Sequence, residues 1–366
     1  MMGWIRAPLL VHLCVRSTHS PPCLIAAEAT RCFATEGGSA ASSPNRTVRI
    51  LYAGHPDRFE EYRPPLLRAL DGAGLTSVDL SDDPGDDPGS YEYMLFAPNG
   101  PVSEFAPFSG VRAVLSLWAG VEWVSSNPTV PPSVPVTRMV DPGLRDGMVE
   151  YVTGHVLRYH LRVDDMWRAK EEARWGQGDS GETMLPLASQ RTVGVLGMGE
   201  LGGACADSLS NMGFRVLGWS RTEKSREGAE CRWGPDGLDS ILAESDVLVL
   251  LLPNTPETAD LINVDALNKC KPGVAIINPG RGSLIDDGAL LSALDSGRVS
   301  GATLDVFRTE PLPPSHPYWR HPRVLVTPHI AAKTRAATAA LVIAENIRRA
   351  EAGRDLLFRV DREAGY

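Results

Sequence analysis

The sequence predicts an α/β protein with two domains, each built on a doubly wound parallel sheet. Three observations support this prediction. Short apolar runs alternate with helical patterns from residue 47 onward, which is typical of parallel strands joined by helices. A glycine-rich turn near residue 200 opens a second series of the same kind. The chain also has 366 residues, a length that is too great for one ordinary domain and sufficient for two.

The first series begins with the apolar run 48–53, which predicts a strand. A helix that carries Leu66, Leu67 and Leu70 follows it. The acidic Pro/Gly stretch 81–90 is typical of a loop and has no part in a core. Further strands of this series are predicted at residues 75–80, 94–97, 111–117 and 134–140. We therefore expect a first sheet of the Rossmann or flavodoxin kind.

A single long helix is predicted over residues 146–174, Asp146 to Arg174. Its apolar residues recur every three or four positions and define one face: Val149, Val152, Val156, Tyr159, Val163 and Met166. The simplest interpretation is a helix packed within its own domain. A helix of this length can also project beyond one domain, and we expect a homodimer through this region.

Six more strands are predicted after residue 190. They lie at residues 192–196, 215–219, 247–252, 274–278, 302–306 and 324–327, with helical patterns between them. Six strands with intervening helices make a second doubly wound sheet. A last helix, 333–352, has no strand after it and is expected to return to the first domain.

Composition excludes several classes of function. The formal net charge of -9 argues against nucleic acid as the main partner, and no apolar run approaches the ~18 residues of a membrane helix. The cysteines show no metal-ligand spacing and no CxxC pair, so we expect reduced thiols and no bound metal. They are Cys14, Cys23, Cys32, Cys205, Cys231 and Cys270.

The N-terminal segment differs from the rest of the chain. Residues 1–34 contain three arginines and the single acid Glu28, which is typical of an organellar presequence. We expect the mitochondrial matrix first, with plastid or cytosol as alternatives. A secretory signal is a further alternative, in which case Asn45 would begin a glycosylation sequon. Residues 35–46 are small and polar and are expected to form a linker.

The strand at 192–196 runs directly into a G-x-G-x-x-G motif, which predicts a dinucleotide site. Gly197 allows a tight turn, Gly199 lets the backbone approach a pyrophosphate, and Gly202 lets helix and strand pack closely. The helix N-terminus that follows would present its free N–H groups to the phosphates. Residues expected at this turn also include Met198, Glu200 and Leu201.

The end of the next strand indicates which nicotinamide cofactor is used. An NAD site usually has Asp or Glu about 20 residues beyond the motif. This chain has the sequence WSRTEKS at 219–225, with basic and hydroxyl side chains where the acid would stand. Such side chains suit the 2′-phosphate of NADPH. The expected contacts are Ser220, Arg221, Thr222 and Lys224.

Four further motifs resemble a known family. They follow strands at 252–258 (LPNTPET), 278–282 (NPGRG), 304–313 (LDVFRTEPLP) and 327–332 (TPHIAA). Together they resemble the D-isomer-specific 2-hydroxyacid dehydrogenases, and within these the A-type glyoxylate/hydroxypyruvate reductases. The narrower match is carried by the segments 219–225, 310–314 and 360–366. The resemblance covers residues 47–366.

The chemistry of a 2-keto acid independently asks for three of these side chains. The guanidinium of Arg281 can grip both a carboxylate and the adjacent carbonyl. The imidazole of His329 can give a proton to the alkoxide that hydride transfer produces. The carboxylate of Glu310 can fix the imidazole tautomer and favour its protonated form. The resemblance adds Asp305 as a nicotinamide contact, and further cofactor contacts at Leu252, Pro253, Asn254, Thr258 and Pro279.

The loop 117–122 resembles the family loop whose backbone N–H groups bind the substrate carboxylate. Its expected substrate contacts are Trp118, Ala119 and Gly120. Relatives often carry a smaller residue where Trp118 stands. The ring could narrow the pocket toward acids of two or three carbons, or it could pack inward.

The residues predict an NADPH-dependent reductase of a 2-keto acid, and the resemblance implies glyoxylate and hydroxypyruvate as its substrates. The active site is expected in the cleft between a substrate-binding domain, residues 47–145 with 333–366, and an NADP-binding domain, residues 146–332. One alternative is another family member: a D-lactate, phosphoglycerate or formate dehydrogenase. A second is a dinucleotide-sensing protein without catalysis, because transcriptional corepressors share the fold.

Overall fold

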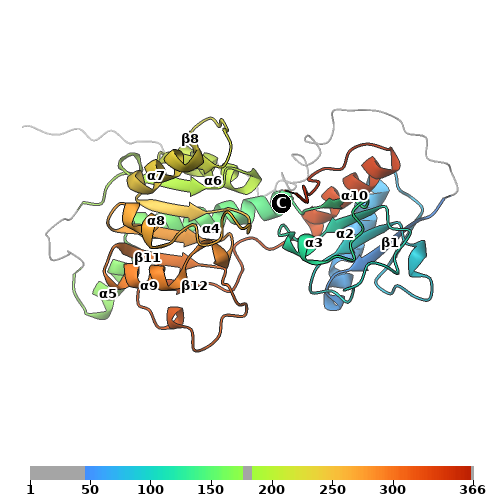
Figure 1. Cartoon of the computed structure of the whole chain (residues 1–366), viewed down its shortest axis with the longest axis horizontal. Coiled ribbons are helices and arrows are strands. Elements are labelled where there is room, and N and C mark those ends of the chain that lie inside the picture. Colours follow the sequence, from blue (N-terminus) through green and yellow to red (C-terminus); the bar gives the residue numbers. More distant parts are fainter. Residues whose placement is uncertain (1–45, 176–183, 364–366) are drawn as a thin grey trace, which may run out of the picture. The chain divides into compact units, whose positions relative to one another are not determined.

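The computed structural model describes residues 46–175 and 184–363, and they form two sheets in which every neighbouring pair of strands is parallel. One sheet has five strands in the order β2-β1-β3-β4-β5, and the other has seven in the order β12-β11-β10-β9-β6-β7-β8 (Figure 1). The predicted class, two doubly wound parallel α/β sheets, is confirmed.

The five-stranded sheet is formed by the first part of the chain. Its strands are β1 (Val48–Ala53), β2 (Val78–Ser81), β3 (Tyr93–Phe96), β4 (Ala113–Ser116) and β5 (Val136–Thr137). Helix α2 (Phe59–Gly72) packs against the C-terminal helix α10 (Ala336–Glu351). The apolar residues of both helices belong to the core of this sheet, so the end of the chain returns to it.

The seven-stranded sheet has one strand more than the sequence analysis expected. Its strands are β6 (Thr192–Leu196), β7 (Arg215–Ser220), β8 (Glu230–Trp233), β9 (Val247–Leu250), β10 (Val274–Asn278), β11 (Val299–Leu304) and β12 (Val324–Val326). The prediction of six strands was wrong because it missed β8. This strand lies at the edge of the sheet and has no fully buried residue, so it lacks the apolar run that identifies the others.

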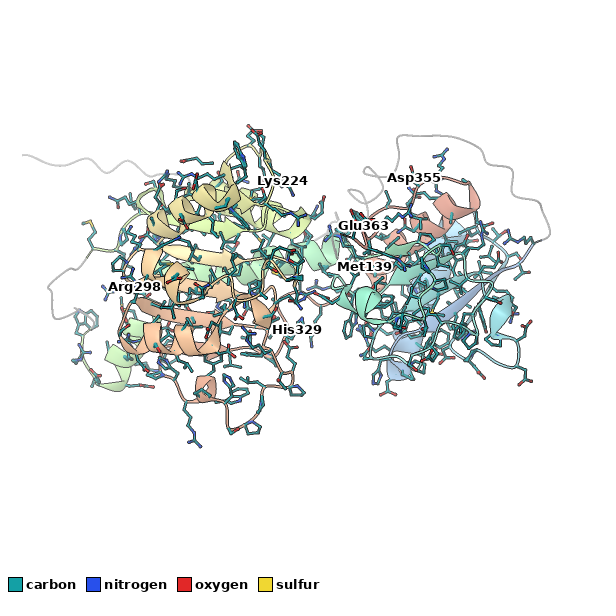
Figure 2. The ribbon with its side chains drawn as sticks, in the orientation of Figure 1. Met139, Lys224, Arg298, His329, Asp355 and Glu363 are labelled. Atoms are coloured by element: carbon teal, nitrogen blue, oxygen red, sulfur yellow. The ribbon has the colours of Figure 1, made fainter. Side chains whose placement is uncertain are left out.

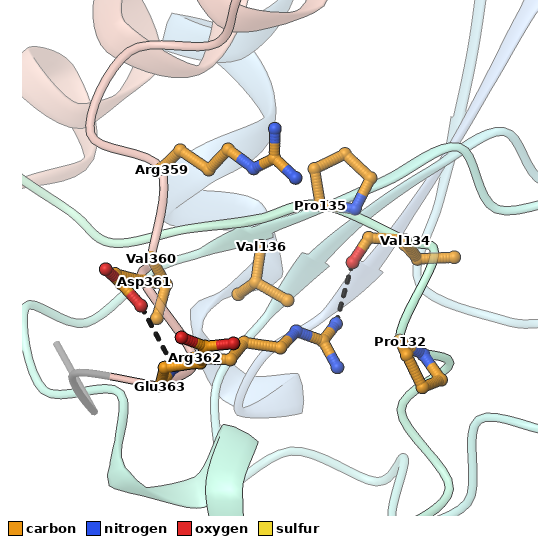
Figure 3. A pocket seen from close by; sticks show the side chains of 9 residues that line it. All are labelled: Pro132, Val134, Pro135, Val136, Arg359, Val360, Asp361, Arg362 and Glu363. Carbon is orange, nitrogen blue, oxygen red and sulfur yellow. Dashed lines mark hydrogen bonds between the residues drawn. The ribbon is translucent and has the colours of Figure 1, made fainter.

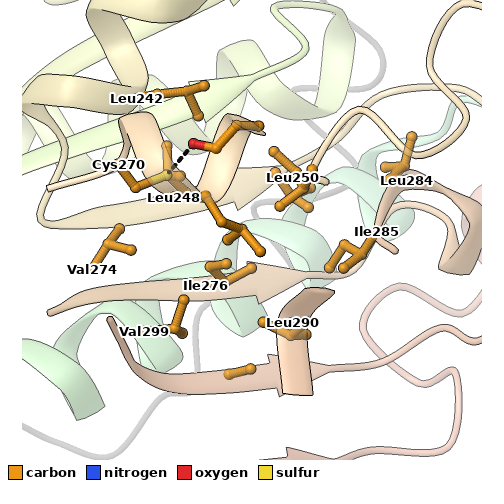
Figure 4. Packing of buried hydrophobic residues seen from close by; sticks show 14 of the residues in the cluster. Leu242, Leu248, Leu250, Cys270, Val274, Ile276, Leu284, Ile285, Leu290 and Val299 are labelled. Carbon is orange, nitrogen blue, oxygen red and sulfur yellow. Dashed lines mark hydrogen bonds between the residues drawn. The ribbon is translucent and has the colours of Figure 1, made fainter. Parts of the chain in front are cut away.

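Alternating residues of β9 show how both faces of this sheet are covered. Leu248 and Leu250 pack in one core with α7 (Gly234–Glu244), α8 (Val264–Lys269) and α9 (Asp287–Asp295) (Figure 4). Val247 and Val249 belong to a second core with α4 (Pro142–His160) and α6 (Glu200–Asn211). Successive strand residues point to opposite faces, and each fully buried side chain of this size contributes about 1.5–3 kcal/mol.

The long helix predicted over residues 146–174 is two helices. Helix α4 ends at His160, and α5 (Val163–Glu171) follows a left-handed turn at Arg162, where φ is 54°. The inner part of the predicted apolar face is buried, with Val152 and Val156 in the core shared with α6. Beyond the break the spacing no longer describes one face, and Met166 is 46% exposed.

No helix within residues 46–175 and 184–363 is both long and apolar enough to cross a membrane. The described cysteines, Cys205, Cys231 and Cys270, are free. Burial raises the pKa of the Cys205 thiol to about 12 and that of Cys270 to about 11, which keeps both protonated and unreactive. The predicted presequence, most of the linker, the sequon Asn and the other three cysteines lie outside the described residues.

Candidate functional site

The glycine-rich turn joins β6 to α6 and leaves an open cradle. Gly197 has a φ of 110°, a conformation that suits glycine. A Cβ at Gly202 would collide with the carbonyl of Gly197, so helix and turn are in close contact. A Cβ at Gly199 would meet nothing within 4 Å, and no side chain caps the N-terminus of α6 there. Exposed N–H groups beside open space fit a dinucleotide pyrophosphate.

The turn after β7 brings one of its basic side chains, that of Lys224, to this cradle. The ammonium of Lys224, which is labelled in Figure 2, donates a hydrogen bond to the carbonyl of Met198. The two atoms are 3.0 Å apart, and Met198 belongs to the glycine-rich turn. The hydroxyl of Ser220 donates to the carbonyl of Thr222 at 2.7 Å and orders the start of the turn. Residues 221–225 are exposed. Lys224 therefore lies beside the cradle, where an additional phosphate would be accessible to it, and Arg221 is exposed on the same turn.

His329 and Glu310, predicted from different motifs, are brought together by the fold. His329 Nδ1 lies 2.7 Å from Glu310 Oε2. The other carboxylate oxygen, Oε1, accepts a hydrogen bond from the backbone N–H of Phe307 at 2.8 Å. Because an ionised carboxylate only accepts, Nδ1 carries the hydrogen and Nε2 is the nitrogen left for other chemistry. The side chains are 56% and 35% exposed, so both are accessible to a small ligand.

The turn that carries His329 is anchored by Asp305. This residue is 0% exposed, and its carboxylate accepts hydrogen bonds from the N–H groups of Ile330 at 2.9 Å and Ala331 at 2.8 Å. Its carbonyl accepts from the N–H of His329 at 2.9 Å. In the structure, Asp305 is thus hydrogen-bonded to the backbone of the turn that carries His329. The nicotinamide contact implied by the resemblance stays a prediction.

Arg281 follows β10 in a loop held by its own residues. Asn278 donates from its side-chain amide to the carbonyl of Arg281 at 2.8 Å, and its side-chain oxygen accepts from the N–H of Gly280 at 3.1 Å. A Cβ at Gly282 would collide with the backbone of Phe307, so this loop is in contact with the one that leads to Glu310. The three predicted catalytic side chains therefore lie on adjoining strand-end loops.

The sequence analysis missed a partner of Arg281. Its Nε donates to Oε1 of Glu122 at 2.6 Å, and Glu122 begins the short helix α3 (Glu122–Ser126). A Cβ at Gly120 would collide with the same guanidinium. The loop 117–122 and Arg281 are therefore in direct contact. Glu122 stood within the quoted substrate loop, but nothing in its local sequence signalled a partner 159 positions away.

Trp118 is held by its backbone rather than its ring. Its N–H donates to the hydroxyl of Ser116 at 3.1 Å, and its carbonyl accepts from the N–H of Met139 at 3.0 Å. As a whole residue Trp118 is 41% exposed. Of the two alternatives considered for it, packing inward is therefore wrong. A role in narrowing the substrate pocket stays a prediction.

The remaining predicted cofactor contacts follow β9 and β10. Thr258 donates from its hydroxyl to the carbonyl of Pro253 at 2.7 Å, which closes the loop 253–258. Asn254 accepts a hydrogen bond from the hydroxyl of Ser283 at 2.8 Å, just beyond the Arg281 loop. These contacts join the loops after β9 and β10 next to Leu252 and Pro279.

A separate hollow lies on the five-stranded part of the chain and is lined by none of the predicted site residues. Its walls are the segment around β5 and the C-terminal residues 359–363 (Figure 3). Arg362 closes one side by donating to the carbonyl of Val134 at 2.7 Å. The hollow is therefore not part of the candidate site.

Comparison with known proteins gives consistent matches. Residues 153–331 match the family described as D-isomer specific 2-hydroxyacid dehydrogenase, NAD binding domain. The glyoxylate/hydroxypyruvate reductase A of Escherichia fergusonii is 40% identical over 265 residues, which cover 70% of this chain and 82% of that protein.

Two solved structures are similar over their full lengths. A D-isomer specific 2-hydroxyacid dehydrogenase from Xanthobacter autotrophicus Py2, in complex with NADPH and MES, has a TM-score of 0.80 and 38% identity, covering 88% of this chain and 100% of that one. The NADPH-dependent glyoxylate/hydroxypyruvate reductase of Sinorhizobium meliloti, in complex with NADP and sulfate, has a TM-score of 0.77 and 32% identity, covering 87% and 100%.

These relatives correct the expected localisation. They come from bacteria, which have no mitochondria, and they point to a cytosolic protein rather than a mitochondrial one. The mitochondrial expectation was wrong because a basic, acid-poor N-terminus is a compositional signal that many segments share by chance.

Proposed function

Because the chain belongs to the D-isomer specific 2-hydroxyacid dehydrogenase family, we propose that it reduces glyoxylate to glycolate and hydroxypyruvate to D-glycerate with NADPH. The observation that carries this proposal is the His329–Glu310 pair, held at 2.7 Å on a loop that adjoins the loop of Arg281. The substrates follow from the relatives whose names state that activity.

NADP(H) is the cofactor that the residues fit. The open cradle at Gly199 suits the pyrophosphate, and the turn with Arg221 and Lys224 suits the 2′-phosphate. The relatives solved with NADPH or NADP agree with this assignment. When bound, the nicotinamide supplies the hydride that the keto carbon receives.

Three side chains of this protein bind and orient the substrate and supply the proton. Arg281 binds the substrate carboxylate and the neighbouring carbonyl oxygen, and thereby orients the keto carbon. His329 gives the proton on Nε2 to that oxygen as it becomes an alkoxide, so the product is the neutral hydroxyl group. Glu310 holds Nδ1–H and stabilises the imidazolium before the proton is given up.

Substrate binding must also change the environment of Arg281. The Glu122 carboxylate bonds to the Nε edge of its guanidinium, and a substrate carboxylate is attracted to the same cation. We infer that Glu122 keeps Arg281 extended toward the loop 117–122 until the keto acid arrives.

The test is NADPH oxidation with a panel of keto acids, repeated with NADH. Rapid oxidation with glyoxylate and hydroxypyruvate, and slower oxidation with pyruvate and phosphohydroxypyruvate, is the expected result. Preference for pyruvate or phosphohydroxypyruvate would identify a D-lactate or phosphoglycerate dehydrogenase. Tight NADPH binding without turnover of any acid would indicate a sensor and would contradict the proposal.

We also propose a homodimer that uses the α5 region. Met166 and Trp167, two large apolar side chains within the 146–174 region expected at the interface, are exposed on α5. Light scattering on dilute protein should give twice the chain mass. A monomer at all concentrations would rule the dimer out.

A further inference from the structure

A chain of three side chains connects helix α4 to the turn that carries His329. The hydroxyl of Tyr151, on α4, lies 2.7 Å from the hydroxyl of Thr327, which lies 2.6 Å from Oδ1 of Asp305. An ionised carboxylate only accepts, so the hydrogen of Thr327 is committed to Asp305. Tyr151 must then be the donor to Thr327, and the chain of hydrogen bonds has one direction.

This series of hydrogen bonds ends at Asp305, which holds the backbone around His329. The Asp305 carboxylate accepts from the N–H groups of Ile330 and Ala331, and its carbonyl accepts from His329 itself. His329 has a φ of 51°, a left-handed conformation that costs a residue other than glycine free energy. Such a conformation persists only where the surrounding contacts hold it, and these hydrogen bonds are those contacts.

Tyr151 is placed on a rigid element. The next residue, Val152, is fully buried in the core shared with α6, and so is Val156 one turn later. The ring of Tyr151 packs edge-on against His155, with 4.4 Å between ring centroids. Burial raises the pKa of Tyr151, so its hydroxyl keeps the hydrogen that it donates.

We propose that Tyr151 is a positioning residue for the reaction: through Thr327 and Asp305 its hydroxyl holds the 327–331 turn so that Nε2 of His329 meets the keto oxygen. The proposal rests on the proposed role of His329 as the proton donor. Tyr151 touches neither substrate nor cofactor in this role. Its effect is on where the proton is delivered.

The same helix offers a matched control. The hydroxyl of Tyr159 lies 2.9 Å from the hydroxyl of Thr303, on strand β11. This contact has the same chemistry and also joins α4 to the sheet. Thr303 lies within the strand, however, and its hydroxyl is hydrogen-bonded to Tyr159 and Arg158, both on α4, rather than to the histidine turn. Tyr159→Phe therefore measures what loss of such a bond does to stability alone.

The experiment compares Tyr151→Phe with Tyr159→Phe in the full chain. Both variants keep the ring and lose one hydroxyl. Tyr151→Phe should lower kcat for glyoxylate roughly three- to tenfold, the effect of one hydrogen bond, with KM changed less than about twofold. Tyr159→Phe should leave kcat unchanged. In a Thr327→Val background, Tyr151→Phe should not lower kcat any further, because the series of hydrogen bonds is already interrupted at residue 327.

Amide hydrogen exchange provides a readout that does not depend on activity. Tyr151→Phe should speed exchange at Ile330 and Ala331 severalfold, and Tyr159→Phe should not. Unchanged exchange at these amides, or an equal fall of kcat in both variants, overturns the proposal. If the parent protein reduces no keto acid, the proposed function fails, and the exchange data still decide whether Tyr151 holds the turn.

Discussion

The turn 327–331 and the loop 117–122 both follow parallel strands and both belong to the candidate site, but they are held in different ways. The turn is fixed by the fully buried carboxylate of Asp305, which binds two of its N–H groups. The strand end of the loop is fixed by hydroxyls: Ser116 binds the backbone of Trp118, and Thr334 donates to the carbonyl of Leu117 at 2.8 Å. The charged contact of the loop, the Glu122–Arg281 pair at 2.6 Å, is between two side chains and holds none of the loop's backbone N–H groups. Charged acceptors make the stronger bonds.

The difference follows from what each segment has to do. A proton donor must stand within hydrogen-bond distance of one atom, and a small displacement of it is costly. A loop that selects the substrate needs only a surface that fits it. Because Trp118 is exposed, its side chain can be replaced without disturbing the packing of the core. We therefore expect changes in the turn to affect turnover and changes in the loop to affect substrate preference.

The largest expected effect is that of His329→Ala. Removal of the proton donor should lower kcat for glyoxylate by roughly 10²–10⁴-fold, while NADPH binding is retained. Steady-state kinetics and NADPH fluorescence titration measure the two quantities. Turnover at the parental rate would show that the turn 327–331 does not carry the proton donor. The functional distinction between this turn and the loop 117–122 would then be wrong.

Arg221→Asp extends the comparison to an exposed loop that serves the cofactor. Loss of charged hydrogen bonds to the 2′-phosphate should raise KM for NADPH roughly 10- to 100-fold, with KM for NADH affected far less. The ratio of the two constants is the measurement, and kcat at saturating NADPH is the control. Equal losses with both cofactors would mean that this turn does not bind the additional phosphate.

Gly120→Ala tests how closely the loop 117–122 must approach Arg281. The added methyl group would collide with the guanidinium, whose flexible end can shift, so the cost should be at the low end of about 1–3 kcal/mol. We expect KM for glyoxylate to rise roughly five- to tenfold, with a melting temperature lowered by only about 2–4 °C. An unchanged KM would show that Arg281 reaches the substrate from another position.

Trp118→Ala should have the smallest effect. The ring is exposed, so the free energy of unfolding should change by less than about 0.5 kcal/mol. If the ring narrows the pocket, kcat/KM for longer keto acids relative to glyoxylate should rise roughly two- to fivefold, less than a well-packed contact would give. An unaltered substrate profile would remove Trp118 from the specificity loop.

Local patterns were sufficient wherever a feature depends on neighbours in the sequence. The buried strands β1, β6 and β10 lie at the predicted residues, because a strand buried on both faces must be a continuous apolar run. The glycine-rich turn and the strand-end motifs of Arg281, Glu310 and His329 were visible for the same reason. Parallel strands bring their carboxyl ends to one edge, so the juxtaposition of Glu310 and His329 could be inferred without coordinates.

Tertiary structure decided everything that joins distant segments or departs from periodicity. The three- and four-residue spacing of apolar residues continues in the sequence across Arg162, so no pattern reveals that the helix breaks there, and the edge strand β8 has no buried face to mark it. The partners Glu122 with Arg281 and Tyr151 with Thr327 are 159 and 176 positions apart. A hydrogen bond between side chains depends on where the packed core places two backbones. The positions of those two backbones depend on the contacts of the whole packed core, and no local segment of the sequence determines them.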